Sequence, residues 1–169
     1  MPTNKVLFIS VDYLRDNSII NGNVDGVYLE PYITIAQNIH IEAIIGTKLY
    51  NNLVSTISSL SVVDKKLLDD YIQPALIQWS MYEALPFINY KLTNKSVSTN
   101  GSDNADPVGL EEIHYLRESI KSAAESLSER TTDFLRENVL DYPLYCANGD
   151  ALDDIHPNKD NFTCGLVLD

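Results

Sequence analysis

The sequence predicts a mainly α protein: a helical bundle of about four to five helices, two of them long, with a short β segment possible near each terminus. Apolar residues recur at three- to four-residue spacing through most of the chain, which is the period of an amphipathic helix. Capping residues, prolines and glycines stand where such stretches begin and end. At 169 residues, with 44% apolar and 21% charged residues, the chain has the size and composition of one globular domain.

The N-terminal part begins with a β-like run, Leu7–Ile9, which stops at a serine. Ser10 to Asp16 has the pattern of a short helix capped by Ser10 and with Asp12 in its first turn, where the helix dipole favours a carboxylate. Residues 17–26 are rich in Asn, Gly and Asp, so we expect a loop there.

Two structures compete for the stretch from Tyr28 to Ile45. Four of its isoleucines alternate, and isoleucine favours a strand. Pro31, however, suits a first helical turn, and Gly46 stands where a helix is often closed by glycine. We therefore favour a helix followed by Gly46 and a second helix over 48–57, capped by Thr47.

After a Ser-rich link over 58–62, the stretch from Val63 to Ile88 is apolar on nearly every face. A helix of this kind is a buried one, so we expect it to form the core. Pro74 and Pro86 lie within the pattern, and each is expected to bend or end the helix because proline lacks the backbone donor.

The polar stretch from Thr93 to Asp106 is predicted to be a loop. A long helix then begins with Asp106 as its cap and Pro107 in the first position, and its apolar stripe continues to about Asn138. A helix of that length approaches roughly 45 Å, longer than a small globule needs, which suggests a partner on its far side.

The chain is expected to divide into a helical domain, 1–145, and an extended C-terminal tail, 146–169. The tail ends in a second β-like run, Cys164–Leu168, which could pair with Leu7–Ile9 or add a strand to a neighbouring subunit. We expect either the 93–106 loop or this tail to reach an adjacent protein.

The charge balance is strongly acidic, with 24 Asp and Glu against 12 Lys and Arg and a net charge of −12. Binding to a phosphate backbone depends on Lys and Arg, so the composition argues against a sequence-specific nucleic-acid binder. The charge could serve solubility alone, or it could line a channel along which DNA slides. We find no transmembrane stretch and no export signal, so we expect an intracellular protein without membrane contact.

Residues capable of metal or acid–base chemistry are scattered. The histidines His40, His114 and His156 are each isolated, which favours structural roles. Cys146 and Cys164 could join His114 and His156 in a zinc site, but neither cysteine belongs to the short pairs that closed zinc sites use. Free thiols are the preferred interpretation.

Two groups of acidic residues are further candidates for a site. The cluster Asn148–Asp154 lacks the alternating ligands and closing Glu of a calcium loop. Glu42 and Glu83 lie in apolar helices and could form a carboxylate pair, although a salt-bridged structural role is commoner. No nucleotide-binding or hydrolase motif is present, so we expect no catalytic, cofactor-binding or metal-binding residue, no cofactor and no enzymatic activity. Ten tyrosines against one tryptophan suit half-buried contacts between subunits.

Several short motifs resemble those of small helical head–tail connector proteins of tailed bacteriophages, most of all those of Bacteroidetes-infecting and crAss-like phages. The first is Ala36-Gln37 followed by Ile44-Ile45-Gly46-Thr47-Lys48-Leu49-Tyr50 and Leu53. The second is Tyr71-Ile72-Gln73-Pro74-Ala75-Leu76, followed by Glu83-Ala84. The polar loop, the long helix and the Tyr142-Pro143-Leu144-Tyr145 ending continue the match along nearly the whole chain.

The resemblance implies a virion structural protein at the neck, assembled in the host cytoplasm. Such proteins form a ring, commonly of about twelve copies. The ring docks beneath the portal protein, contacts neighbouring tail or ring proteins, and extends a channel through which DNA passes without sequence-specific binding. The alternative is an intracellular helical adaptor or regulator that binds a partner protein through the same long helix.

Overall fold

The computed structural model describes residues 6–20, 25–88, 90–92, 97–99, 110–146 and 154–157. In chain order the elements are α1 (Val11–Asp16), α2 (Gly26–Ala36), η1 (Gln37–Ile41), α3 (Glu42–Ile45), α4 (Thr47–Thr56), η2 (Ile57–Ser59), α5 (Val62–Leu67), η3 (Leu68–Ile72), α6 (Gln73–Ile88), β1 (Tyr90–Leu92), β2 (Val97–Thr99), α7 (Leu110–Glu137) and α8 (Pro143–Cys146). The prediction of a mainly α bundle with two long helices is confirmed.

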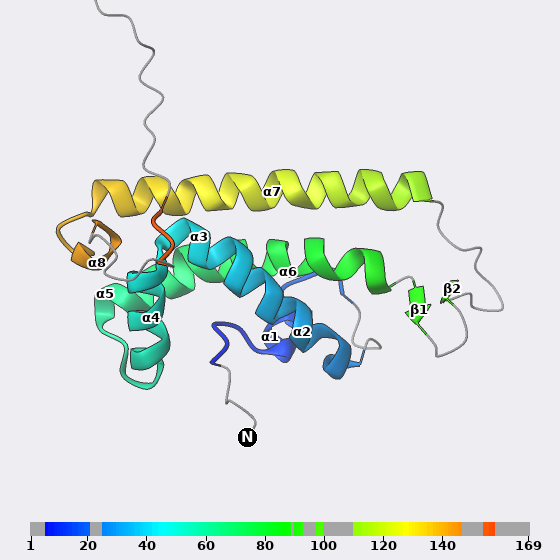
Figure 1. Cartoon of the computed structure of the whole chain (residues 1–169), viewed down its shortest axis with the longest axis horizontal. Helices are drawn as coiled ribbons and strands as arrows, with labels where there is room; N and C mark the ends of the chain where they lie inside the picture. The colour runs from blue at the N-terminus through cyan, green and yellow to red at the C-terminus, as the bar shows by residue number, and fades with distance from the viewer. Residues whose placement is uncertain are drawn as a thin grey trace, which may run out of the picture.

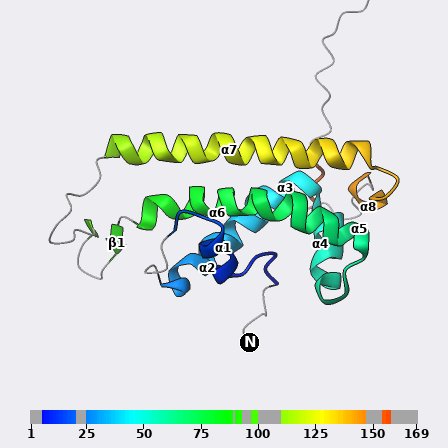
Figure 2. The same cartoon turned by 180° about the vertical axis from the view of Figure 1, so that it is seen from behind.

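Two of the helical rods are built from several elements. α2, η1 and α3 follow one another without a break over residues 26–45, and α5, η3 and α6 do so over 62–88. α7 has 28 residues and is therefore about 42 Å long. It runs alongside α6, while α2 crosses α6 on the near side in Figure 1 and behind it in Figure 2. α6 is thus the central helix, packed between α2 and α7.

The core lies around α6, as the apolar pattern predicted. Its side chains at Leu76, Ile77, Trp79 and Met81 are all buried, and Leu76 is fully inaccessible to solvent. Three other helices each bury one row of apolar residues in this core. These residues are Leu29, Ile33 and Ala36 from α2, Leu49 and Leu53 from α4, and Ile120, Ala124 and Leu135 from α7. Burial of these side chains is the main force that holds the rods together.

The central rod, residues 62–88, contains two prolines, and the first of them, Pro74, does not break the helix. The π-helical η3 ends at Ile72, two residues before Pro74, and Gln73 donates its backbone N–H to the carbonyl of Leu68, five residues back. The wide turn places the proline where a missing donor is tolerated, so the helix continues through it. Pro86 lies two residues before the end of α6 at Ile88, close to the boundary that its chemistry favours.

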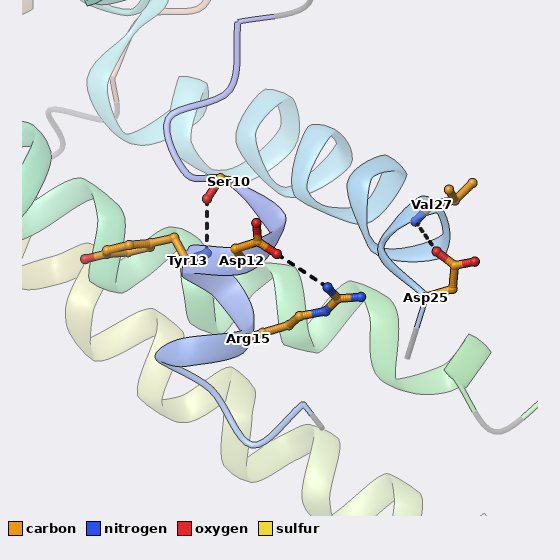
Figure 3. Close-up of polar contacts among 6 residues, drawn as sticks. All are labelled: Ser10, Asp12, Tyr13, Arg15, Asp25 and Val27. Carbon is orange, nitrogen blue, oxygen red and sulfur yellow. Dashed lines mark hydrogen bonds and ion pairs between the residues drawn. The ribbon is translucent and has the colours of Figure 1, made fainter. Parts of the chain in front are cut away.

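The prediction that Pro31 lies in a first helical turn is wrong, because α2 already begins at Gly26. Asp25 starts the helix: its Oδ1 accepts from the N–H of Val27 at 3.1 Å. Figure 3 shows this cap beside that of α1, where Ser10 Oγ accepts from the N–H of Tyr13 at 3.0 Å. A capping carboxylate satisfies N–H groups that a helix start leaves open, and this outweighs the preference of proline for the first turn.

The β-like run Leu7–Ile9 forms no strand. Instead, two glutamine side chains bind the backbone of Phe8. Gln37 Oε1 accepts from its N–H at 2.8 Å, and Gln73 Nε2 donates to its carbonyl at 3.0 Å. The ring of Phe8 also packs edge-on against Tyr50, with 5.5 Å between ring centroids. Because the two glutamine side chains bond to the N–H and carbonyl of Phe8, these backbone groups are satisfied without a sheet.

Strands occur elsewhere, partly inside the segment predicted to be a loop. β1 and β2 pair in antiparallel fashion, with Tyr90 opposite Thr99 and Leu92 opposite Val97. The loop prediction for 93–106 is therefore wrong at 97–99, and its remaining residues lie outside the described part of the chain, as do Asp106 and Pro107. The β-like run Cys164–Leu168 also lies outside it.

Candidate functional site

The rod formed by α2 and η1 carries apolar residues on two faces. Its inner face buries Leu29, Ile33 and Ala36 completely. Its outer face, which we call the α2 stripe, consists of Val27, Tyr28, Pro31, Ile35 and Ile39. Val27 is 73% exposed, Tyr28 69% and Ile39 57%. A helix that is apolar on both faces normally has both covered, so the α2 stripe is a candidate contact surface.

The surface around the α2 stripe is hollowed. A shallow groove of about 360 Å³ is lined by Val27, Glu30, Pro31, Thr34 and Ile35. A pair of stacked rings adds apolar area at the junction of α2 and α6. Tyr32 lies on Phe87 with ring centroids 5.3 Å apart, and Phe87 is itself exposed. A groove lined by apolar and polar side chains beside an aromatic pair is a shape that a protein side chain or segment can fill.

Smaller groups of exposed apolar residues mark the two ends of α7. Tyr115 and Leu116 lie exposed near its start, while Val139, Leu140 and Leu144 are exposed just beyond its end. The predicted partner-binding role of the long helix stays a prediction. The α2 stripe was not predicted from the sequence, although two of the isoleucines that suggested a strand, Ile35 and Ile39, belong to it.

The histidine of this rod, His40, lies half-buried between η1 and α6. Its ring stacks on Trp79 with 3.7 Å between centroids, and its Nε2 lies 2.9 Å from Glu83 Oε1. Trp79 in turn donates to Ser128 Oγ at 2.9 Å, which links the cluster to α7. Every polar atom of the cluster named here has a protein partner, which suits a structural contact between three helices.

The other candidates for metal chemistry are not brought together. His114 lies exposed on α7 and His156 is exposed beside Pro157; the side chain of Cys146 and all of Cys164 lie outside the described part of the chain. Of the Asn148–Asp154 cluster, only Asp154 is described. Among the described residues, no three His, Cys, Asp or Glu side chains lie together as metal ligands.

Glu42 and Glu83 have different partners and form no carboxylate pair. Glu83 contacts His40, whereas Glu42 Oε1 accepts from the hydroxyl of Thr47 at 2.8 Å. That hydroxyl was predicted to cap the following helix, which is wrong. The helix cap at this corner is Gly46, and Thr47 is already the first residue of α4.

A family model matches residues 41–155, more than half of the chain. The chain belongs to DUF6712, a family of unknown function. No curated protein matches the sequence, and no solved structure matches the fold. The DUF6712 match covers α3 to α8. The α2 stripe lies before the matched segment, on the N-terminal part of the rod that ends with α3.

The DUF6712 segment ends at Ile155, whose contact with Thr47 was not predicted from the sequence. Ile155 pairs with Thr47 through two hydrogen bonds: the N–H of Thr47 donates to the carbonyl of Ile155 at 3.0 Å, and the N–H of Ile155 donates to Thr47 Oγ1 at 2.9 Å. The buried Pro157 then packs on Gly46. Residues 154–157, which we call the C-terminal strap, therefore lie firmly on the α3–α4 corner.

Within the described part of this DUF6712 protein, no helix is both long enough and apolar enough to cross a membrane.

The pKa of Tyr142 gives a prediction for alkaline pH. Burial, with the nearby carboxylates of Asp64 and Asp141, raises this pKa from 10.0 to about 12, and the hydroxyl donates to the carbonyl of Val63 at 2.9 Å. The folded protein holds this proton more tightly than the unfolded chain. The stability that it contributes is therefore complete below pH 10 and is lost as the pH rises towards about 12.

We expect the free energy of unfolding to fall across this pH range by less in Tyr142→Phe than in the unchanged protein. Urea unfolding at a series of alkaline pH values measures the difference. Tyr115→Phe, at an exposed position of α7, is the control and should follow the unchanged protein. Equal slopes for all three proteins would show that Tyr142 titrates like a free tyrosine.

Proposed function

We propose that this chain is a virion structural protein, one subunit of a head–tail connector ring that docks beneath the portal of a tailed bacteriophage and extends its DNA channel. The observation that carries the proposal is the α2 stripe, a row of exposed apolar residues on a rod whose opposite face already lies in the core. Exposed apolar surface of this kind favours association with another protein.

The distribution of the exposed apolar groups supports a ring. Helix α2, which carries most of the α2 stripe, lies on the near side of α6 in Figure 1. Tyr115 and Leu140 are exposed at opposite ends of the α7 region. Contacts between two different surfaces of the same chain are heterologous. Repetition of a heterologous contact generates a closed ring when its rotation divides a full circle.

The charge supports a channel without DNA binding. The chain has a net charge of −12, and α7 itself carries seven Asp or Glu against four Lys or Arg. A surface of this sign repels the phosphate backbone, so DNA can pass without being held. The connector-like motifs around Gly46-Thr47 and Pro74 support the same proposal.

An assembly assay tests the role of the α2 stripe. We expect the Ile35→Asp, Ile39→Asp double variant to lose assembly, alone or on a portal protein, with an apparent affinity lowered more than about tenfold. The reason is that two carboxylates would have to enter an apolar contact without partners. Native mass spectrometry and light scattering, with and without the portal protein, measure the copy number.

The matched control is Asn51→Asp, Ser55→Asp, which adds the same two charges at the same spacing on exposed positions of α4. It should assemble like the unchanged protein. Assembly of the Ile35→Asp, Ile39→Asp variant at the control's affinity would exclude the α2 stripe as the contact. Binding of a single partner protein in place of a ring would favour the adaptor alternative.

A further inference from the structure

We infer that the α2 stripe of one subunit receives α5 of a second copy of this chain, with Val62 entering the groove and Lys65 pairing with Glu30. The inference rests on the proposed function, in which copies of the chain contact one another through the α2 stripe, and it names the surface on the neighbouring copy. The charge, shape and position of the two surfaces each support this pairing.

The groove of the α2 stripe carries one charged residue. Glu30 lines it together with Val27, Pro31, Thr34 and Ile35, and Glu30 is exposed. Val27 comes three residues before Glu30, so the two are neighbours on the helix surface. Among the residues that the structure describes, no cation pairs with this carboxylate. The groove therefore combines an apolar hollow with an unpaired negative charge.

Helix α5 has the complementary features. Val62 is its first residue and is 88% exposed. Lys65 follows three residues later, so it lies beside Val62 on the helix surface, and it is exposed without an ionic partner in the described part of the chain. The ammonium of Lys66 lies over an aromatic ring of α7, and Asp64 accepts from the Ser61 hydroxyl at 2.8 Å. Lys65 is thus a cation available next to a protruding apolar side chain.

The exposed apolar groups at the two ends of α7 carry the wrong charge for this groove. On the helix surface Tyr115 is surrounded by three exposed carboxylates, those of Glu111, Glu112 and Glu118. Leu140 is followed directly by the exposed Asp141. Either group would bring a carboxylate towards Glu30, and like charges across a contact oppose binding. Charge therefore favours α5 over both ends of α7.

The two surfaces are too far apart to meet within one subunit. Val62 begins the central rod, whereas Tyr32, in the helix that forms the groove, stacks on Phe87 near the end of that rod. The 25 residues between Val62 and Phe87 correspond to about 37 Å along a helix. Figures 1 and 2 both show α5 at the end of the bundle where α7 finishes, and the start of α2 towards the opposite end.

A contact between α5 and the α2 stripe therefore joins two copies through different surfaces. Each copy keeps one α5 and one α2 stripe unused, so a third copy can add in the same way. This is the heterologous contact from which a closed ring is built. The apolar residues of both surfaces leave water in the contact, while the lysine and the carboxylate fix which surface is chosen.

Charge reversal in the full chain tests the contact. We expect Glu30→Lys and Lys65→Glu, each alone, to weaken self-association at least about fivefold, because each variant brings like charges together. The Glu30→Lys, Lys65→Glu double variant should recover the affinity to within about twofold of the unchanged protein, since the pair is formed again with its signs exchanged. Sedimentation velocity over a series of concentrations, with and without the portal protein, measures the affinity, and circular dichroism checks the fold.

The matched control combines Glu30→Lys with Lys121→Glu, a reversal of the same sign on α7. Both double variants keep the net charge of −12, so a recovery caused by net charge alone would occur in both. Recovery with Lys65→Glu and not with Lys121→Glu supports the inference. Equal recovery with both, no recovery with either, or single variants that associate like the unchanged protein overturns it.

The proposed function and this inference fail in different ways. Assembly that is lost in Ile35→Asp, Ile39→Asp but unchanged in the charge variants overturns the inference alone and leaves the ring in place. A chain that stays monomeric at every concentration, with the portal protein included, overturns both.

Discussion

Replacement of Gly46 by alanine is expected to lower the free energy of unfolding by roughly 2–4 kcal/mol. Gly46 has φ +79° and ψ 153°, a conformation that side chains other than hydrogen strongly disfavour. An added Cβ would also lie 2.7 Å from Cδ of Pro157 and 3.3 Å from the carbonyl oxygen of Ile155. The variant should therefore lose both the α3–α4 corner and the C-terminal strap.

Urea unfolding measures this loss, and hydrogen exchange at the Ile155 amide shows whether the strap is released. Gly26→Ala is the control, because its new Cβ would meet side-chain atoms alone, the nearest being Cγ1 of Val11 at 3.0 Å, and Gly26 does not have a positive φ. Pro157→Ala in the Gly46→Ala background should recover the part of the cost that comes from the proline ring. A Gly46→Ala protein as stable as Gly26→Ala would contradict both parts of the explanation.

Replacement of Gln37 by leucine is expected to cost about 3 kcal/mol and to release the N-terminal segment. The Gln37 side chain accepts from the N–H of Phe8 at 2.8 Å and donates to the carbonyl of Val6 at 3.0 Å and to Tyr50 Oη at 2.9 Å. Leucine has a similar size but leaves these groups without their partner. A buried donor or acceptor left unpaired costs about 1–3 kcal/mol.

Hydrogen exchange at the Phe8 amide checks this prediction. Loss of protection at that amide distinguishes release of the N-terminal segment from general destabilisation. Gln78→Leu makes the same change at a half-buried position of α6 and should leave that amide protected. A double variant that also changes Gln73 measures the coupling between the two glutamines. Unchanged exchange at Phe8 in Gln37→Leu would mean that the segment is held by its ring alone.

Much of the fold follows from local signals in the sequence. The cap at Ser10, the glycine at position 46 and the all-round apolar pattern after Val63 led to helices that the structure contains. These signals act over one or two helical turns, so a single sequence is enough to identify them. Pro31 led to an expected helix start near Tyr28, whereas the Asp25 cap, which was not predicted, starts α2 at Gly26.

What could not be predicted depends on residues distant in sequence. Phe8 finds its partners 29 and 65 residues away, and Thr47 finds Ile155 108 residues away. The π-helical segments η1 and η3 change which residues of a rod point outward, and no local residue type marks such a segment. The α2 stripe was missed for the same reason: its exposure depends on where α6 and α7 lie.

The hydrogen bonds from Gln37 and Gln73 to the backbone of Phe8 set an order for folding during synthesis. Gln37 and Gln73 lie on separate rods, and the second of them is made 65 residues after Phe8. The N-terminal segment therefore leaves the ribosome long before both of its partners exist, and its apolar run stays unpaired until the central rod has formed. Contacts between such distant residues also form slowly, so we expect Phe8 to be among the last parts of the core to become protected.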